Sequence, residues 1–220
     1  MMKHDDHVHQ IRTEPIYAIL GETFSRGRTN RQVAKALLGA GVRIIQYREK
    51  EKSWQEKYEE ARDICQWCNE YGATFIMNDS IDLAIACEAP VIHVGQDDAP
   101  VAWVRRLAQR DIVVGVSTHT IAEMKKAVRD GADYVGLGPM YQTTSKMDVH
   151  DIVADVDKAY ALTLPIPVVT IGGIDLIHIR QLYTEGFRSF AMISALVGAT
   201  DIVEQIGAFR QVLQEKIDEC

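Results

Sequence analysis

Hydrophobic residues follow two alternating patterns along the 220-residue chain. Short runs of apolar, mostly β-branched residues are followed by longer stretches in which apolar residues recur at helical spacing. The short runs predict eight strands, at residues 16–20, 42–47, 74–77, 91–93, 112–116, 134–137, 168–171 and 189–193. The longer stretches predict helices at residues 29–38, 54–70, 81–87, 101–109, 121–129, 152–162, 176–184 and 202–217.

The order of these elements predicts the architecture. Glycines and prolines mark the joins, and Gly41 and Gly131 each follow a helix. The strands are nearly continuous in apolar residues, as parallel strands buried on both faces are. Eight such strand–helix units predict a single α/β domain, a closed (β/α)8 TIM barrel over residues 14–220. An open doubly wound sheet is the alternative, but no Gly-x-Gly-x-x-Gly follows the first strand.

The first thirteen residues differ from the rest because they are mostly polar. They include His4, His7 and His9, interspersed with two aspartates. These histidines could form a weak metal site. Because the segment offers little apolar surface to bury, we expect a disordered or loosely ordered tail over residues 1–13.

The balance of charges excludes some partners. With 24 basic and 31 acidic residues the net charge is -7, so no overall basic field favours nucleic acid. No apolar run approaches the roughly 20 residues that cross a bilayer. The start of the chain also lacks a signal-peptide core, so no membrane partner and a cytoplasmic location are expected. A homo-oligomer stays open, because the outer helices of a barrel are either solvated or covered by a partner.

The end of the second predicted strand carries an unusual group of side chains. Gln46, Arg48 and Lys50 alternate with Tyr47 and Glu49. In an extended chain the first three therefore point to one side. A fork of guanidinium donors beside an ammonium suits a polyphosphate. The alternative is a strand that emerges into solvent with ordinary surface charges.

Other strand ends add polar groups to what would be the same rim of the barrel. Asn78 and Asp79 follow the third strand, Asp98 the fourth, Ser117 the fifth and Lys146 the sixth. Each has an ordinary explanation, such as a helix cap or a loop lysine. Together they favour a ligand site, since active sites of such barrels lie at the carboxyl ends of the strands.

The chemistry of this rim fits a diphosphate. Asp79 and Asp98 offer the hard oxygen ligands that Mg²⁺ prefers. Mg²⁺ with Arg48, Lys50 and Lys146 would neutralise a pyrophosphate and make it a leaving group. 

A second anion site is predicted across the rim. Gly172, Gly173 and Ser194 follow the seventh and eighth strands, where barrels commonly bind a phosphate monoester. Two anion sites on one mouth imply two phosphorylated substrates, or one ligand with phosphates at both ends.

These motifs resemble, in order, those of the thiamine phosphate synthase family. Gln46-Tyr47-Arg48-Glu49-Lys50 is similar to the family's Gln-Leu-Arg-Glu-Lys. The other matching segments are residues 78–79, 93–98, 115–120, 131–139, 143–146, 171–174 and 193–195. The resemblance implies a Mg²⁺-dependent transferase that joins hydroxymethylpyrimidine diphosphate to thiazole phosphate and releases pyrophosphate. It implies a dissociative reaction, in which the protein positions the substrates and stabilises charge.

The resemblance also implies roles for individual residues. The pyrimidine diphosphate would be held by Gln46, Arg48, Lys50, Asn78, Ser117 and Lys146. Mg²⁺ would be held by Asp79 and Asp98. The thiazole phosphate would be held by Thr143, Ser145, Gly173, Ile193 and Ser194, and Thr144 would contact substrate as well. The catalytic residues would be Arg48, Lys50, Ser117 and Lys146.

Some positions depart from the family pattern. Tyr47 replaces the usual Leu, and the alternation of side chains predicts that it points away from the phosphates and packs. Gln142 and Ser145 also differ from the common residues, and both bear on the thiazole loop.

Two other functions compete with the synthase. Related barrels act as thiazole tautomerases, and His119 lies where that group carries a catalytic histidine. That group tends to lose the diphosphate and Mg²⁺ residues, which this chain retains, so the synthase is favoured. A non-catalytic barrel that binds a phosphate ligand is the other candidate, although it would have no need of Asp79 and Asp98.

Overall fold

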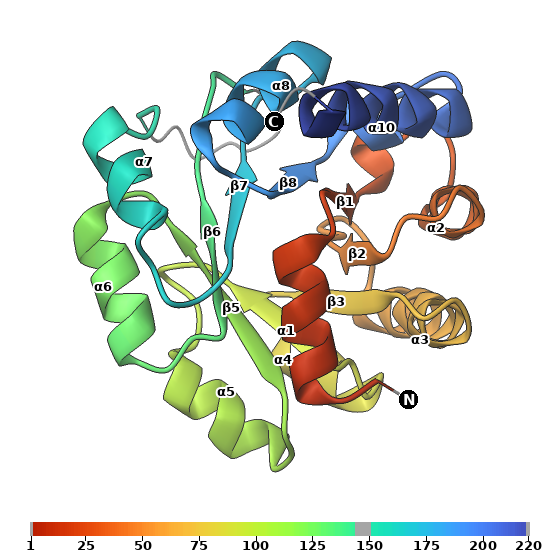
Figure 1. Ribbon diagram of the computed structural model, residues 1–220. Helices are drawn as coiled ribbons and strands as arrows, with labels where there is room; N and C mark the ends of the chain where they lie inside the picture. Colours follow the sequence, from red (N-terminus) through yellow and green to blue (C-terminus); the bar gives the residue numbers. More distant parts are fainter. Residues whose placement is uncertain (1, 144–150, 219–220) are drawn as a thin grey trace.

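The computed structural model describes residues 2–143 and 151–218, and within them eight parallel strands close into a barrel. The strands are β1 (Ile16–Leu20), β2 (Ile44–Tyr47), β3 (Thr74–Asn78), β4 (Val91–Val94), β5 (Val113–Thr118), β6 (Tyr134–Leu137), β7 (Val168–Ile171) and β8 (Ser189–Met192). Each strand pairs with the next in the sequence, and β1 pairs with β8 to close the ring. The predicted single-domain (β/α)8 barrel is therefore confirmed (Figure 1).

Helices surround the ring of strands (Figure 1). The predicted ones are α2 (Asn30–Gly39), α3 (Trp54–Glu70), α4 (Ile81–Ala86), α5 (Val101–Ala108), α6 (Ile121–Arg129), α7 (Asp155–Ala161), α8 (Leu176–Glu185) and α10 (Ile202–Asp218). Two short helices were not predicted, η1 (Glu22–Phe24) and α9 (Ser194–Val197). None of the described helices is both long and apolar enough to cross a membrane.

The strands are buried on both faces, as their apolar composition predicts. All five side chains of β1 are buried. Tyr17 and Ile19 line a cavity inside the barrel, and the alternation of side chains turns Ala18, between them, toward the surrounding helices. This alternation decides which side chains of each strand reach the interior.

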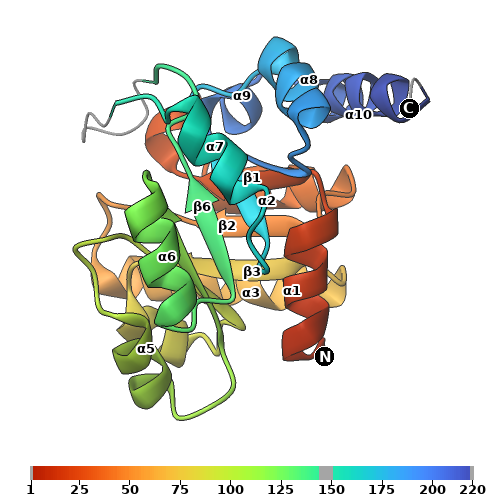
Figure 2. The same ribbon diagram turned by 60° about the vertical axis from the view of Figure 1, so that its left-hand side comes forward.

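The N-terminal residues form a helix, so the expectation of a disordered tail is wrong. Helix α1 (His4–Thr13) lies across one end of the barrel (Figures 1 and 2). Ile11 is fully buried, and His7 Nδ1 lies 2.9 Å from Thr74 Oγ1. Gln10 Nε2 donates to the carbonyl of Gly72 over 3.0 Å. The segment is an ordered helix because His7 and Ile11, one helical turn apart, pack against the barrel and close its amino-terminal end.

The histidines of α1 do not gather around one point. His7 is held by Thr74, whereas His4 Nε2 lies 3.4 Å from Asp133 Oδ1. In the part of the chain that the structure describes, no three His, Cys, Asp or Glu side chains form a cluster able to hold a metal.

Candidate active site

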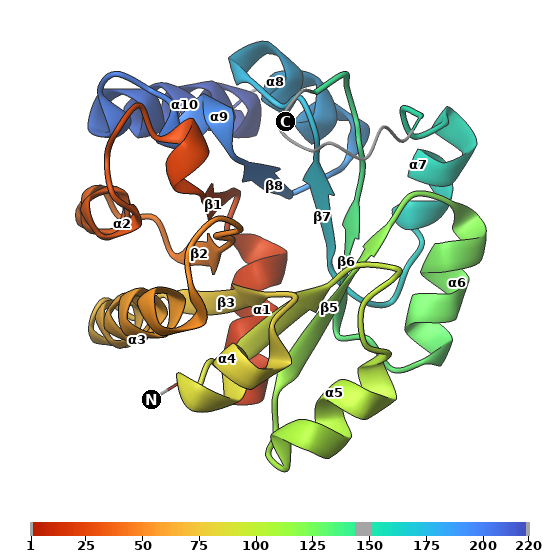
Figure 3. The ribbon, with the colours of Figure 1, turned by 180° about the vertical axis from the view of Figure 1, so that it is seen from behind.

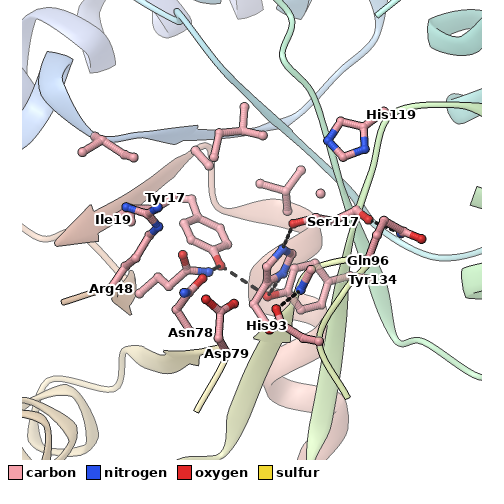
Figure 4. A pocket seen from close by; sticks show the side chains of 18 of the residues that line it. Tyr17, Ile19, Arg48, Asn78, Asp79, His93, Gln96, Ser117, His119 and Tyr134 are labelled. Atoms are coloured by element: carbon pink, nitrogen blue, oxygen red, sulfur yellow. Dashed lines mark hydrogen bonds between the residues drawn. The ribbon is translucent and has the colours of Figure 1, made fainter. Parts of the chain in front are cut away.

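Figure 3 shows the barrel from the end opposite α1. The loops that follow the strands form two adjoining cavities at this end. The first has a volume of about 440 Å³ and is lined by most of the predicted diphosphate and metal residues. These are Gln46, Arg48, Lys50, Asn78, Asp79, Asp98 and Ser117. Figure 4 shows Arg48, Asn78, Asp79 and Ser117 among the side chains around this cavity. Parallel strands place their carboxyl ends at one rim, so residues far apart in sequence meet there.

The side chains at the end of β2 alternate as predicted. Gln46, Arg48 and Lys50 line the first cavity. Tyr47 is buried on the other side of the strand, where its hydroxyl donates to Glu60 Oε2 over 2.8 Å. The packing role expected for Tyr47 is thereby confirmed.

Asp79 is held in a conformation that costs the backbone energy. Its φ is +59°, in the left-handed region that residues other than glycine seldom adopt. Lys50 Nζ lies 2.7 Å from Asp79 Oδ2. Burial raises the pKa of Asp79, but the hydrogen bond and charge of Lys50 outweigh it and hold that pKa below its usual range.

Asp98 approaches Asp79 from the loop after β4. Its Oδ2 accepts the N–H of Gly95 over 2.7 Å. Partial burial, together with the charge and hydrogen bond of Asp79, raises the pKa of Asp98. The two carboxyl groups therefore compete for a proton, as carboxylates do when they are brought close together.

This pair of carboxylates fits a hard divalent cation. Mg²⁺ commonly binds one or two protein carboxylates and takes its remaining ligands from water and substrate phosphates. Asp79 and Asp98 would offer such an ion two oxygen ligands, and the cavity that they line is also lined by Arg48 and Lys50. No third acidic, His or Cys side chain joins such a group within residues 2–143 and 151–218, so water and substrate would supply the rest.

The second cavity, of about 810 Å³, lies beside the loops after β6, β7 and β8. It is lined by Thr143, Gly173, Ile193 and Ser194, four of the residues that the resemblance implies for the thiazole phosphate. A Cβ on Gly173 would lie 2.5 Å from the Gln142 carbonyl oxygen, so this glycine allows two loops to touch.

Three predicted residues, Thr144, Ser145 and Lys146, lie outside the described residues. The two cavities share a boundary that includes Ser117, His119 and Ile193. A ligand in one cavity could therefore reach a ligand in the other.

Several polar side chains of the site escaped the sequence prediction. Tyr17 and Tyr134 line the first cavity but read as ordinary strand residues in the sequence. His93 stands inside one of the quoted motifs, and its Nε2 lies 2.9 Å from Ser117 Oγ. His119, by contrast, is identified in the sequence by the resemblance to the tautomerases; its Nδ1 lies 3.0 Å from Glu123 Oε2. The inward phase of each strand is the signal that would have identified the two tyrosines.

Comparisons with known proteins indicate one family. The family model described as thiamine monophosphate synthase matches residues 16–196. A thiamine-phosphate synthase from Caldicellulosiruptor saccharolyticus is 40% identical over 201 residues, which cover 91% of each chain. One from Pelotomaculum thermopropionicum is 38% identical and aligns with 92% of this chain and 94% of its own.

A solved structure leads to the same family. The thiamine phosphate pyrophosphorylase from Pyrococcus furiosus superposes with a TM-score of 0.82 at 27% identity. The superposition covers 93% of this chain and 98% of that one. Because the family model spans most of the chain and these relatives align along nearly its whole length, the chain belongs to the thiamine monophosphate synthase family.

Proposed function

We propose that this protein is a thiamine-phosphate synthase, a transferase that joins 4-amino-2-methyl-5-hydroxymethylpyrimidine diphosphate to 4-methyl-5-(2-phosphoethyl)thiazole. The products are thiamine phosphate and pyrophosphate. The observation that carries the proposal is the grouping of two cations and two carboxylates in one cavity beside a second cavity. Family membership and the names of the relatives support the same reaction.

The first cavity is suited to release of pyrophosphate. Mg²⁺ bound by Asp79 and Asp98 would offset the negative charge of the diphosphate. Arg48 and Lys50 would bind the same group and stabilise the charge that grows as the bond between the methylene carbon and oxygen breaks. Asn78 and Ser117 would add neutral hydrogen bonds. The electron pair of the broken bond leaves with pyrophosphate.

The walls of the cavity would protect the cation that remains on the pyrimidine methylene. Ile19, Ile171, Ala191 and Ile193 line this side of the cavity and offer no nucleophile. Exclusion of water from such a site prevents capture of a reactive intermediate by hydroxide. The thiazole nitrogen, arriving from the second cavity, would then form the new carbon–nitrogen bond.

The border between the cavities favours a second candidate function. His119 lines both cavities and is held by Glu123 at 3.0 Å, an arrangement suited to acid–base chemistry. An isomerase acting on a thiazole carboxylate phosphate would use such a group. This activity would need neither the diphosphate cations nor a metal.

The setting of the reaction is also part of the proposal. We place the enzyme in the cytoplasm, because Cys65, Cys68 and Cys87 are free thiols and no described helix could span a membrane. A homo-oligomer is proposed with it, and light scattering of the purified protein would measure the mass in solution.

The decisive test is an assay of pyrophosphate release by the purified protein. We expect release only with both substrates and Mg²⁺, with thiamine phosphate appearing in equal amount. Conversion of a thiazole carboxylate phosphate in the absence of pyrophosphate release would support the isomerase instead. Binding without turnover of either kind would favour a non-catalytic barrel.

The metal assignment has its own test in Asp98→Asn. We expect kcat to fall about 100-fold or more, because a preorganised charge partner is lost from the site. Asp97→Asn changes the charge of the same cavity equally and leaves the Gly95 hydrogen bond to Asp98 in place, so it should cost far less. Full activity and unchanged Mg²⁺ dependence in Asp98→Asn would refute the assignment.

A further inference from the structure

A chain of hydrogen bonds lines the first cavity and joins two of the predicted substrate contacts, Gln46 and Ser117. It begins where Gln46 Nε2 donates to the Tyr17 hydroxyl over 2.7 Å. The Tyr17 hydroxyl lies 3.3 Å from the Tyr134 hydroxyl, which lies 3.0 Å from His93 Nδ1. His93 Nε2 lies 2.9 Å from Ser117 Oγ, at the other end (Figure 4). Five strands thus contribute one side chain each to a continuous path.

The first donor imposes a direction on the whole chain. An amide N–H can only donate, so Tyr17 accepts from Gln46. Among the described residues Tyr134 is the remaining partner of the Tyr17 hydroxyl, so the proton of Tyr17 points to Tyr134. Tyr134 in turn gives its proton to His93 Nδ1. A neutral imidazole that accepts at Nδ1 carries its hydrogen on Nε2 and donates there, in this case to Ser117.

The burial of the two tyrosines favours this order of donors and acceptors. Tyr134 is fully buried and Tyr17 is 2% exposed. Leaving one such hydroxyl without its partner would cost about 1–3 kcal/mol. Burial also raises the pKa of both phenols well above the usual value, so both keep their proton and each supplies one donor.

The backbone leaves room for the two rings at the centre of the chain. A Cβ on Gly115 would collide with the ring of Tyr134 and lie 2.6 Å from His93 Nδ1. A Cβ on Gly136 would lie 3.1 Å from His93 Cε1. The position of these side chains, not a turn, therefore requires a glycine at 115 and leaves little space for a larger residue at 136.

We infer that Tyr134 and His93 are positioning residues that keep Ser117 as a hydrogen-bond donor toward the diphosphate of the substrate. The Ser117 oxygen accepts from His93, so the hydroxyl proton of Ser117 is available to a group inside the cavity. If every donor and acceptor in the chain were exchanged, Ser117 would donate its proton to His93, and an oxygen lone pair of Ser117 would face the anion. The inference rests on the proposed function for the identity of that anion.

A double-mutant cycle tests the coupling to Ser117. We expect Tyr134→Phe to lower kcat/KM for the pyrimidine diphosphate about 10- to 100-fold, as loss of a supporting hydrogen bond commonly does. Ser117→Ala should cost at least as much. If Tyr134 acts through the serine proton, the double variant should be no worse than Ser117→Ala alone. If the fold-losses in kcat/KM of the two single variants multiply in the double variant, Tyr134 acts independently of Ser117 and the inference is overturned.

A second measurement depends neither on activity nor on any variant of Tyr134. Nitrogen-15 NMR of the wild-type protein distinguishes the two neutral forms of His93, whose signals are identified by their loss in His93→Asn. We expect the proton on Nε2 in the ligand-free protein. A proton on Nδ1 would make His93 the donor to Tyr134 and the acceptor from Ser117, which would contradict the inference. Absence of turnover by the wild type would instead count against the proposed function.

Discussion

The period of two in a β-strand decides the roles of residues 46–50. It sends Gln46, Arg48 and Lys50 to the cavity and Tyr47 and Glu49 to the surrounding helices. The cations therefore belong to the site, and the residues between them belong to the packing.

A prediction at the scale of single residues concerns the ammonium group of Lys50. Lys50→Met keeps the length of the stem and removes the charge beside Asp79, 2.7 Å away. We expect kcat/KM to fall about 100- to 1,000-fold, because a preorganised charge partner of the leaving group is lost. Steady-state kinetics with the pyrimidine diphosphate as the varied substrate measure this.

Lys126→Met is the matched control for that variant. Lys126 is an exposed lysine that pairs with Asp130 at 2.8 Å on helix α6. Such surface pairs contribute about 0–1 kcal/mol, so the control should keep near wild-type kinetics and stability. Equal losses in the two lysine variants would contradict a specific role for Lys50.

At the scale of elements, the carboxylate of Glu49 holds the segment that follows β2 in place. Its Oε1 accepts the N–H groups of Lys50 and Glu51, at 2.9 and 3.1 Å. Its Oε2 accepts from Asn30 Nδ2 at 3.0 Å and from the N–H of Glu22 at 3.3 Å. One buried carboxylate thus ties the loop that carries both cations to the elements that follow β1.

The pKa of Glu49 gives this tie a pH dependence. Burial raises that pKa, but the donors around the carboxylate outweigh burial and leave it lowered. The unfolded chain therefore takes up the proton first, at about pH 4.3. The stabilisation is present above that pH and is lost as the pH falls through the lower pKa of the folded protein.

Glu49→Gln should lower the free energy of unfolding at pH 7 by about 1–3 kcal/mol, because an amide cannot accept all four bonds. The difference from wild type should shrink as the pH falls below about 4. Urea unfolding at several pH values measures both effects. Glu70→Gln, at an exposed end of α3, is the control, and a difference that grows in acid would contradict the prediction.

Helix α1 gives a second prediction at the scale of elements. Ile11→Ala removes a fully buried side chain at the amino-terminal end of the barrel. It should destabilise the protein by about 2–5 kcal/mol with little change in kcat, because the site lies at the other end. Ile177→Ala, at a side chain that is 77% exposed, should change stability little. Thermal unfolding and the standard assay distinguish these outcomes.

For the whole molecule, the barrel brings two cavities with different linings to one mouth. The charged side chains that line the first come from the segments after β2 to β5, whereas the second is lined mostly by residues at and after the ends of β6 to β8. Ser117, His119 and Ile193 line both cavities. In the proposed reaction the diphosphate would bind in the first cavity and the thiazole phosphate in the second, a division of the two substrates between two cavities.

Gly173→Ala tests this division. Its φ of +66° disfavours a side chain, and the added Cβ would press on the loop at Gln142. We expect a raised KM for the thiazole phosphate, about tenfold for each 1.4 kcal/mol lost, and unchanged binding of Mg²⁺ with pyrophosphate. Calorimetry measures the second quantity, and its loss would contradict the division.

Gly207→Ala is the control, since no atom would lie within 4 Å of its Cβ inside α10. It should raise stability by up to about 1 kcal/mol, because alanine favours a helix more than glycine does. The kinetics with both substrates should stay unchanged.

The sequence by itself determined the barrel, because the two hydrophobic periods reflect contacts within single elements. It also indicated which strand ends carry chemistry, since the phase of Gln46, Arg48 and Lys50 is a local property. Only the tertiary structure decided the rest. Helix α1 orders because the barrel offers its polar residues partners, and the path from Tyr17 to Tyr134 joins residues 117 apart in sequence. Local patterns contain no information on such contacts, because they arise only when the ring of strands closes.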